Sequence, residues 1–139
     1  MRAEEVLREP EKLARRIVIL SREIEGARRS LEPGGVDYSA DRVQASPVDK
    51  YPAVMDVIIR KEEQLAQLVT RRRWLIYERI PGLLEKVEND LARDIIAAYY
   101  TTDATMAEVA EMCHVSNMTA YRYRWQGLAD IQSALDAES

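Results

Sequence analysis

The sequence predicts an all-helical protein, in which an N-terminal antiparallel helical hairpin precedes a C-terminal helix-turn-helix. Apolar residues recur every three to four positions along two long stretches, as they do in amphipathic and coiled-coil helices. Four of the five prolines lie in the first 52 residues, where they mark the breaks between these stretches. In the last third, residues that favour helix N-caps recur at short intervals. We therefore predict a hairpin arm at residues 1–82 and a helix-turn-helix domain at residues 83–139.

The first long helix is predicted at about residues 10–31. Pro10 suits the first turn, where a missing N–H costs nothing, and Pro33-Gly34-Gly35 ends the helix. Its apolar residues are spaced alternately four and three positions apart, which favours left-handed coiling around a partner helix. This seam consists of Leu13, Ile17, Leu20, Ile24, Ala27 and Leu31.

Residues 32–51 are predicted to form a long connection, because Gly, Pro, Ser and Asp dominate them. The second long helix runs from about residue 52 to residue 80, and Pro81-Gly82 ends it. Two helices alone bury little apolar surface, so we expect the arm to form a homodimer or to pack on the rest of the chain. The basic run Arg71-Arg72-Arg73 is expected to be a solvated face, with contact to phosphates as the alternative.

The C-terminal third changes from long helices to short ones. Asn89 or Asp90 can cap a first helix by accepting backbone N–H bonds. Thr105 caps a second helix, and Glu108, three residues later, completes a capping box. Ser116 caps a third helix directly after a short turn. The three caps therefore predict three consecutive helices.

The spacing within residues 106–125 fits two short helices that cross at a steep angle. Ala110 supplies a small residue for the closest approach. His114, four residues later, lies where the turn needs a residue that tolerates positive φ. The inner faces are apolar, with Val109, Cys113, Val115, Ala120 and Tyr123. These features together predict the helix-turn-helix.

The outer side of the third helix has residues that suit the DNA major groove. There Asn can pair with adenine and Arg with guanine, while Met and Tyr can contact thymine methyl groups. Arg124 is better placed for a phosphate. Packing in the core or in a dimer is the alternative for Tyr121 and Trp125. The predicted DNA-binding residues are Ser116, Asn117, Met118, Tyr121, Arg122, Arg124 and Trp125.

The charge of the chain argues against tight DNA binding through phosphates alone. The formal net charge is −4, and residues 89–139, with three arginines and eight acidic residues, have a charge of −5. Residues 117–126 contain two arginines and no acid, which makes this surface locally +2. We therefore expect binding as a homodimer on two half-sites, or together with a partner already on the DNA.

Catalysis, metal binding and membrane insertion are not expected. One cysteine and one histidine are too few for the usual zinc sites, so we expect no metal and no cofactor. Neither a phosphate-binding glycine loop nor a nucleophile beside a base is present, so an enzyme is not expected. The sequence contains no run of 18 apolar residues, and its start, MRAEEVLREPEKLARR, has no apolar core of signal-peptide length, so a signal peptide is not expected. These absences, with the single cysteine, predict a cytoplasmic protein without a membrane partner.

Two stretches of the chain point to a family: TMAEVAEMCHVSNMTAYRYRWQGL, and the upstream LEPGGVDYSADRVQASPVDK with its DRVQASP core. They resemble the ArpU/RinA-like transcriptional regulators of phages and prophages, over about residues 15–135. The resemblance implies a C-terminal domain like region 4 of a sigma factor, and a DNA-binding regulator, often of late phage gene expression. By position, the residues that match the start of the family's recognition helix are Ser116, Asn117, Met118, Tyr121 and Arg122.

Three functions follow from these observations. The first is a sequence-specific transcriptional regulator that binds double-stranded DNA and has RNA polymerase as a further candidate partner. The second is a phage DNA-packaging protein of the small terminase type, for which a ring of eight or more copies would replace the dimer. The third is a protein-interaction module that retains the helix-turn-helix fold without DNA affinity, as the acidic C-terminal third would suit.

Overall fold

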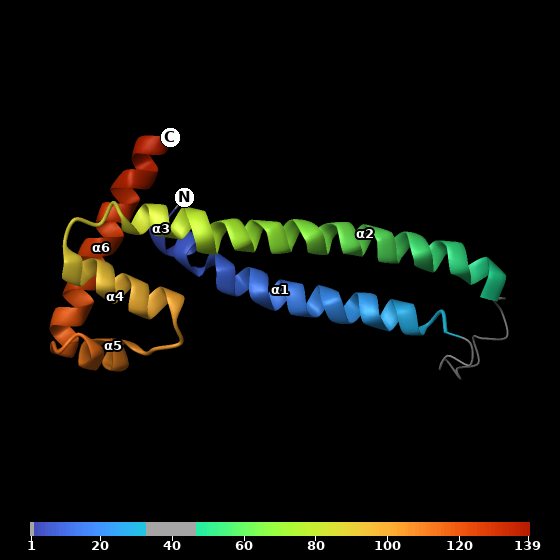
Figure 1. Cartoon of the computed structure of the whole chain (residues 1–139), viewed down its shortest axis with the longest axis horizontal. Helices are drawn as coiled ribbons and strands as arrows, with labels where there is room; N and C mark the ends of the chain where they lie inside the picture. The colour runs from blue at the N-terminus through green and yellow to red at the C-terminus, as the bar shows by residue number, and fades with distance from the viewer. Residues whose placement is uncertain (1, 33–46) are drawn as a thin grey trace. The chain divides into compact units, whose positions relative to one another are not determined.

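A computed structural model of the chain describes residues 2–32 and 47–139. The protein is all-helical over these residues, and they contain no strand (Figure 1). This confirms that the chain is all-helical, as predicted, over the described residues. The elements in chain order are α1 (Ala3–Arg29), α2 (Pro47–Trp74), the π-helix η2 (Leu75–Arg79), α3 (Ile80–Leu84), α4 (Asp90–Thr101), α5 (Met106–Met112) and α6 (Asn117–Glu138). None of the described helices is both long enough and apolar enough to cross a membrane.

The chain divides into two compact units. The first, here called the core unit, combines Met1–Glu11 with Arg73–Ser139, and the second, the two-helix unit, is Lys12–Arg72. This division differs from the boundary predicted at residue 82. The first turns of α1 belong with the C-terminal helices because they pack there, as the bond from the Ala3 backbone N–H to Gln132 Oε1 (2.8 Å) illustrates.

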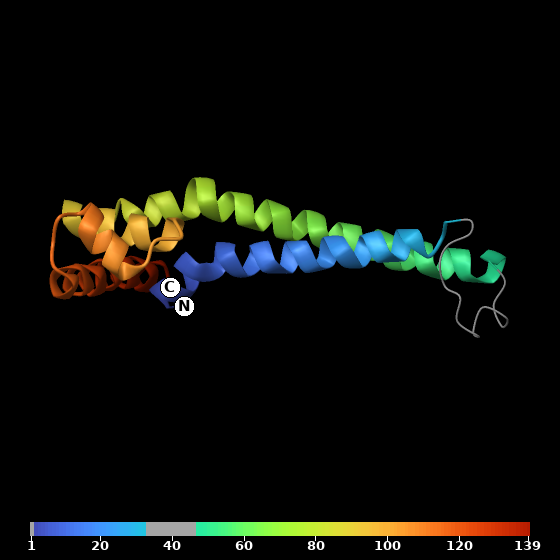
Figure 2. The same ribbon diagram turned by 90° about the horizontal axis from the view of Figure 1, so that it is seen from below.

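In the two-helix unit, α1 and α2 lie side by side and run in opposite directions (Figures 1 and 2). Leu20 and Ile24, from the predicted seam, are buried against Ile58 of α2. An ion pair between Lys61 and Glu23, 2.6 Å from Nζ to Oε2, joins the same two helices at their surface. The unit therefore has a narrow apolar interface that is flanked by charges.

Helix α1 begins earlier than the sequence predicts. It starts at Ala3 rather than near residue 10, and Pro10 lies inside the helix instead of in its first turn. The reason is tertiary: Val6 and Leu7 are buried, so the turns before Pro10 have a packing partner in the core unit. Burial of these side chains offsets the hydrogen bond that an internal proline removes.

The second long helix also differs from its predicted bounds. It begins at Pro47 rather than at residue 52, so the end of the predicted connection is helical. The part of that connection at residues 33–46 lies outside the described residues. Pro81-Gly82 does not end the helical stretch, because α3 continues to Leu84. Leu75 and Leu83 of this stretch are buried, which makes it part of the core unit.

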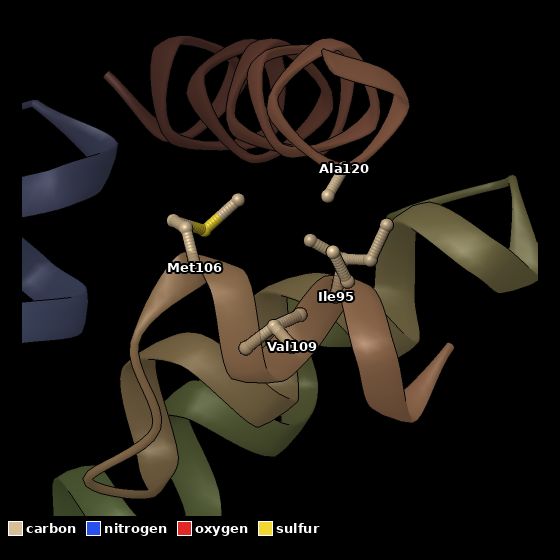
Figure 3. Close-up of a cluster of buried hydrophobic side chains, with 5 residues drawn as sticks. Ile95, Met106, Val109 and Ala120 are labelled. Carbon is tan, nitrogen blue, oxygen red and sulfur yellow. The ribbon is translucent and has the colours of Figure 1, made fainter. Parts of the chain in front are cut away.

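The core unit is built around an apolar cluster between α4, α5 and α6 (Figure 3). The side chains of Ile95, Met106, Val109 and Ala120 point into the space between these three helices. Cys113, Val115 and Tyr123 pack against the cluster while staying partly exposed. The inward positions predicted for α5 and α6 are therefore confirmed.

Local hydrogen bonds set the start of each of these helices, as the sequence predicts. Asn89 Oδ1 accepts the N–H of Ala92 (2.9 Å) at the start of α4. Thr105 and Glu108 form the expected capping box, with both bonds at 3.2 Å. Ser116 Oγ accepts from the N–H of Thr119 (3.1 Å) at the start of α6. Each cap provides a partner for a backbone N–H that the helix itself cannot satisfy.

Helix α6 packs closely against α4 at Gly127. A Cβ atom at this position would lie 2.8 Å from Cγ1 of Ile96, closer than real contacts allow. Ala110, the small residue that the sequence predicts for the closest approach of two helices, is buried. The sequence does not point to Gly127 in the same way, because a glycine inside a helix has no local signature that separates close packing from chance.

Candidate nucleic-acid interface

The turn between α5 and α6 is a Schellman motif with a left-handed residue. His114 has φ of 57°, and it is the one non-glycine residue with positive φ in the described part of the chain. The N–H of Val115 donates to the carbonyl of Ala110 (3.0 Å), and the N–H of His114 donates to that of Glu111 (3.2 Å). This pair of bonds defines the motif and sets the direction in which α6 leaves the turn. The predicted role of His114 as a turn residue is confirmed.

The first turns of α6 expose a row of large side chains. Met118 is 82% exposed, Trp125 58% and Tyr121 44%, and Arg122 is exposed beside them. Their spacing of three, four and seven positions places all four on one side of the helix. Asn117, also exposed, precedes them in the first turn. We call these five residues the α6 face.

The prediction that Arg124 contacts a phosphate is corrected by its burial. Only 8% of Arg124 is exposed. Its guanidinium donates to Glu4 Oε1 from one terminal nitrogen (3.0 Å) and to Tyr100 Oη from Nε (3.1 Å). Arg124 therefore connects α6 with α1 and α4 inside the core unit. The sequence gives no local sign of this, because its partner Glu4 lies 120 residues away.

Aromatic rings surround the Arg124 guanidinium. Its Cζ atom lies 4.5 Å from the ring centroid of Tyr99, 5.5 Å from that of Tyr100, 5.3 Å from Trp125 and 5.9 Å from Tyr121. Cation–π attraction at these distances holds each ring near the charge. Tyr121 and Trp125 thus have one side against Arg124 while they remain exposed on the other. Neither of them is therefore a core residue.

One carboxylate oxygen beside Arg124 accepts hydrogen bonds from three side chains. Glu4 Oε1 accepts from Arg124, from Tyr100 Oη (3.2 Å) and from Arg8 at 3.0 and 3.2 Å. Burial alone would raise the pKa of Glu4, but the hydrogen bonds from Arg8 and Tyr100 and the charge of Arg124 together lower it. Burial raises the pKa of Tyr100, which therefore remains a neutral hydrogen-bond donor. We call Glu4, Arg8, Tyr99, Tyr100 and Arg124 the Arg124 cluster.

The cluster changes the charge available on α6. Because Glu4 pairs with Arg124, the local charge of +2 expected from the sequence is reduced to the single exposed cation Arg122. The Cζ atom of Arg122 lies 5.4 Å from the ring centroid of Tyr123 on the same helix. Residues 117–129 contain no acid, and the acidic residues of α6 begin only at Asp130. The α6 face is therefore mainly apolar, with a weak positive charge.

Cys113 and His114, the single cysteine and the single histidine of the chain, lie in different surroundings. Burial, followed by the charge of Asp94, raises the pKa of the Cys113 thiol, which disfavours the reactive thiolate. Cys113 packs against the apolar cluster, whereas His114 is exposed in the turn. Among the described residues, no group of three or more His, Cys, Asp and Glu side chains is arranged to hold a metal ion.

The core unit also has a concavity, apart from the α6 face, with a volume of about 660 Å³. Arg79, in its wall, donates two hydrogen bonds to Glu138 at 2.7 and 2.6 Å, so its charge is already paired. The hydrogen bond from Arg79 lowers the pKa of Glu138 accordingly. The lining consists of Trp74, Glu78, Arg79, Gly82, Leu83, Lys86, Ala134, Ala137 and Glu138.

Comparison of the chain with protein families, with curated proteins and with solved structures finds no match. The geometry of the α6 face and of the turn before it is therefore the basis on which a function is assigned.

Proposed function

We propose that the core unit is a sequence-specific DNA-binding domain of the helix-turn-helix type, and that the chain is a transcriptional regulator. The observation behind this proposal is the α5–α6 pair. Two capped helices are joined by a Schellman turn, and the second presents an exposed, acid-free row from its first turns. This is the arrangement with which a recognition helix enters the major groove. The resemblance to ArpU/RinA-like regulators supports the same assignment.

The residues of the α6 face would make different kinds of contact with DNA. Asn117 can make two hydrogen bonds to adenine and Arg122 two to guanine, while Met118 and Tyr121 offer apolar contacts. The backbone N–H groups at the start of α6 form the positive end of the helix dipole, which favours a nearby phosphate. Ser116 would remain a cap rather than a base contact, because its hydroxyl already bonds to Thr119.

A homodimer would compensate for the low charge of one face. Each copy offers one exposed cation among residues 117–129, and phosphate contacts supply much of DNA affinity. Two copies on neighbouring half-sites double the number of contacts. The two-helix unit would supply the dimer contact, in keeping with its narrow apolar interface. RNA polymerase is a further candidate partner for the acidic surface of the core unit.

The test is selection of binding sites from a pool of random duplex DNA, at low and at moderate salt. We expect the wild-type protein to enrich one motif, and Arg122→Ala to lose that enrichment by at least about tenfold, the value of one good arginine–guanine pair. Arg15→Ala, an exposed arginine of α1 in the two-helix unit, is the matched control and should behave like the wild type. Absence of binding by the wild type at low salt would contradict the proposal.

A protein-interaction module is the second candidate, and two observations favour it. Met118, Tyr121 and Trp125 are spaced as anchors of a helix that docks into an apolar groove. Residues 89–139 also have a formal charge of −5, which repels DNA. If no DNA binds, Met118→Ala and Tyr121→Ala should be tested for loss of a protein complex. Purified RNA polymerase is the first partner to try.

A further inference from the structure

We infer that the α6 face selects its DNA site mainly through the methyl groups of thymine, so that the preferred sites are rich in A·T pairs. The inference rests on the proposed DNA-binding function and adds the chemistry of discrimination to it. It is drawn from the balance of apolar and charged groups that the structure leaves exposed on α6.

The exposed side chains of the face are predominantly apolar. Met118, at the second position of α6, is 82% exposed, and Tyr121 and Trp125 follow on the same side. At the floor of the major groove the C5-methyl of thymine is the apolar group, whereas the other base edges present hydrogen-bond donors and acceptors. Burying Met118 against any other base would leave polar edges unpaired, which costs affinity, and the ring of Tyr121 can pack on the same kind of methyl group. Thymine is therefore the base that these side chains fit.

The hydrogen-bonding groups of the face add to this preference. Only Arg122 remains to pair with guanine, because Arg124 is held by Glu4 and Tyr100. Asn117 is suited to adenine, which brings a thymine as its pairing partner. The face thus offers one group for a G·C pair and several for A·T pairs.

Two of the three large apolar side chains of the face, Tyr121 and Trp125, also have a contact within the core unit before binding. The ring centroids of Trp125 and Tyr121 lie 5.3 and 5.9 Å from the Arg124 guanidinium, which holds one side of each ring. Side chains that are already ordered lose less entropy on contact than free surface side chains. Arg124 is therefore a positioning residue for the face, although it does not touch the DNA itself.

The experiment replaces thymine by deoxyuridine in the duplex that the full-length protein selects, one position at a time. This change removes a single methyl group and leaves base pairing intact. At each contacted thymine we expect the affinity to fall about three- to fivefold, the value of burying one methyl-sized group. At positions outside the contact, the affinity should stay the same.

A double-mutant cycle assigns the methyl contact to the protein side chain. In Met118→Ala, at least one thymine should lose its difference from deoxyuridine, because the side chain that touched its methyl group is gone. Tyr121→Ala should do the same at a neighbouring position. Tyr77→Ala is the matched control, since Tyr77 is a 74% exposed tyrosine of η2 that is not on the α6 face.

The outcomes separate this inference from the function on which it rests. If the selected duplex binds equally well with deoxyuridine at every position, thymine discrimination is overturned while DNA binding stands. If the wild type binds no duplex at low salt, the proposed function fails first, and the inference with it. Equal thymine–deoxyuridine differences in wild type, Met118→Ala and Tyr121→Ala would overturn the assignment to the α6 face.

Discussion

The two units of this chain are stabilised in different ways. In the core unit, α4, α5 and α6 enclose a continuous apolar cluster, each helix has a side-chain cap, and the Arg124 cluster joins α6 with α4 and the start of α1. In the two-helix unit, the buried apolar side chains among the described residues are Leu20, Ile24 and Ile58. A layer of two helices leaves half of each helix surface in water, so its stability depends on a narrow seam. The core unit is therefore held by contacts among several helices, whereas the two-helix unit depends on a single interface between α1 and α2.

The largest expected difference between the units lies in their apolar cores. Ile95→Ala, in the core unit, should lower the free energy of unfolding by about 3–5 kcal/mol, because three helices cannot collapse around the cavity. Ile58→Ala, in the two-helix unit, should cost nearer 2 kcal/mol, since two helices can shift toward each other. Urea unfolding of both variants measures the difference.

Equal losses of unfolding free energy in Ile95→Ala and Ile58→Ala would contradict this expected difference between the units. Such a result would mean that the surroundings of Ile58 are as rigid as those of Ile95. A second copy of the chain packed over Ile58 is the first explanation to test. Repeating the unfolding at several protein concentrations decides the matter, because only a dimer's stability depends on concentration.

The next expected effect has opposite signs in the two units. Gly127→Ala should destabilise the protein by about 1–2 kcal/mol, because overpacking against Ile96 outweighs the better helix propensity of alanine. Gly26→Ala in α1 should stabilise it by up to about 1 kcal/mol, since the added Cβ would have no atom within 4 Å apart from the neighbouring backbone of its own helix. Thermal unfolding distinguishes the two, and a gain from Gly127→Ala would show that α4 and α6 can separate without loss.

The smallest expected effect concerns the Arg124 cluster and depends on pH. Glu4→Gln should lower the free energy of unfolding at pH 7 by about 1 kcal/mol, a value reduced because more than a third of the Glu4 side chain is exposed. The folded state lowers the pKa of Glu4, so its contribution is present above the ordinary value of 4.5 and is lost as the pH falls through the lowered one.

The measurement is the urea midpoint of wild type and Glu4→Gln between pH 7 and pH 2. The two curves should converge at the acid end, while the exposed neighbour Glu5→Gln should follow the wild type throughout. A difference that persists at pH 2 would show that Glu4 acts through its shape rather than its charge.

The sequence determined those features whose causes lie within a few residues. The caps at Asn89, Thr105 and Ser116 need only a side-chain oxygen and an N–H two or three positions later. Histidine is one of the residue types that tolerate positive φ, as His114 does in the turn before α6. The apolar seam through Leu20 and Ile24 follows from helical periodicity. Interactions of this range join residues only a few positions apart, so the sequence pattern alone predicted them.

The tertiary structure decided the features whose causes lie far apart in the chain. Arg124 looks like a phosphate ligand in the sequence, but Glu4 and Tyr100 bury its charge inside the core unit. Pro10 would begin a helix, yet burial of the turns before it places it within α1. Packing of distant segments outweighs the preference of Pro10 for a helix start, and charge pairing with a distant carboxylate outweighs the preference of Arg124 for solvent. Each of these local preferences is worth only about 1–3 kcal/mol, and the interacting residues lie too far apart in the sequence for a local pattern to contain both.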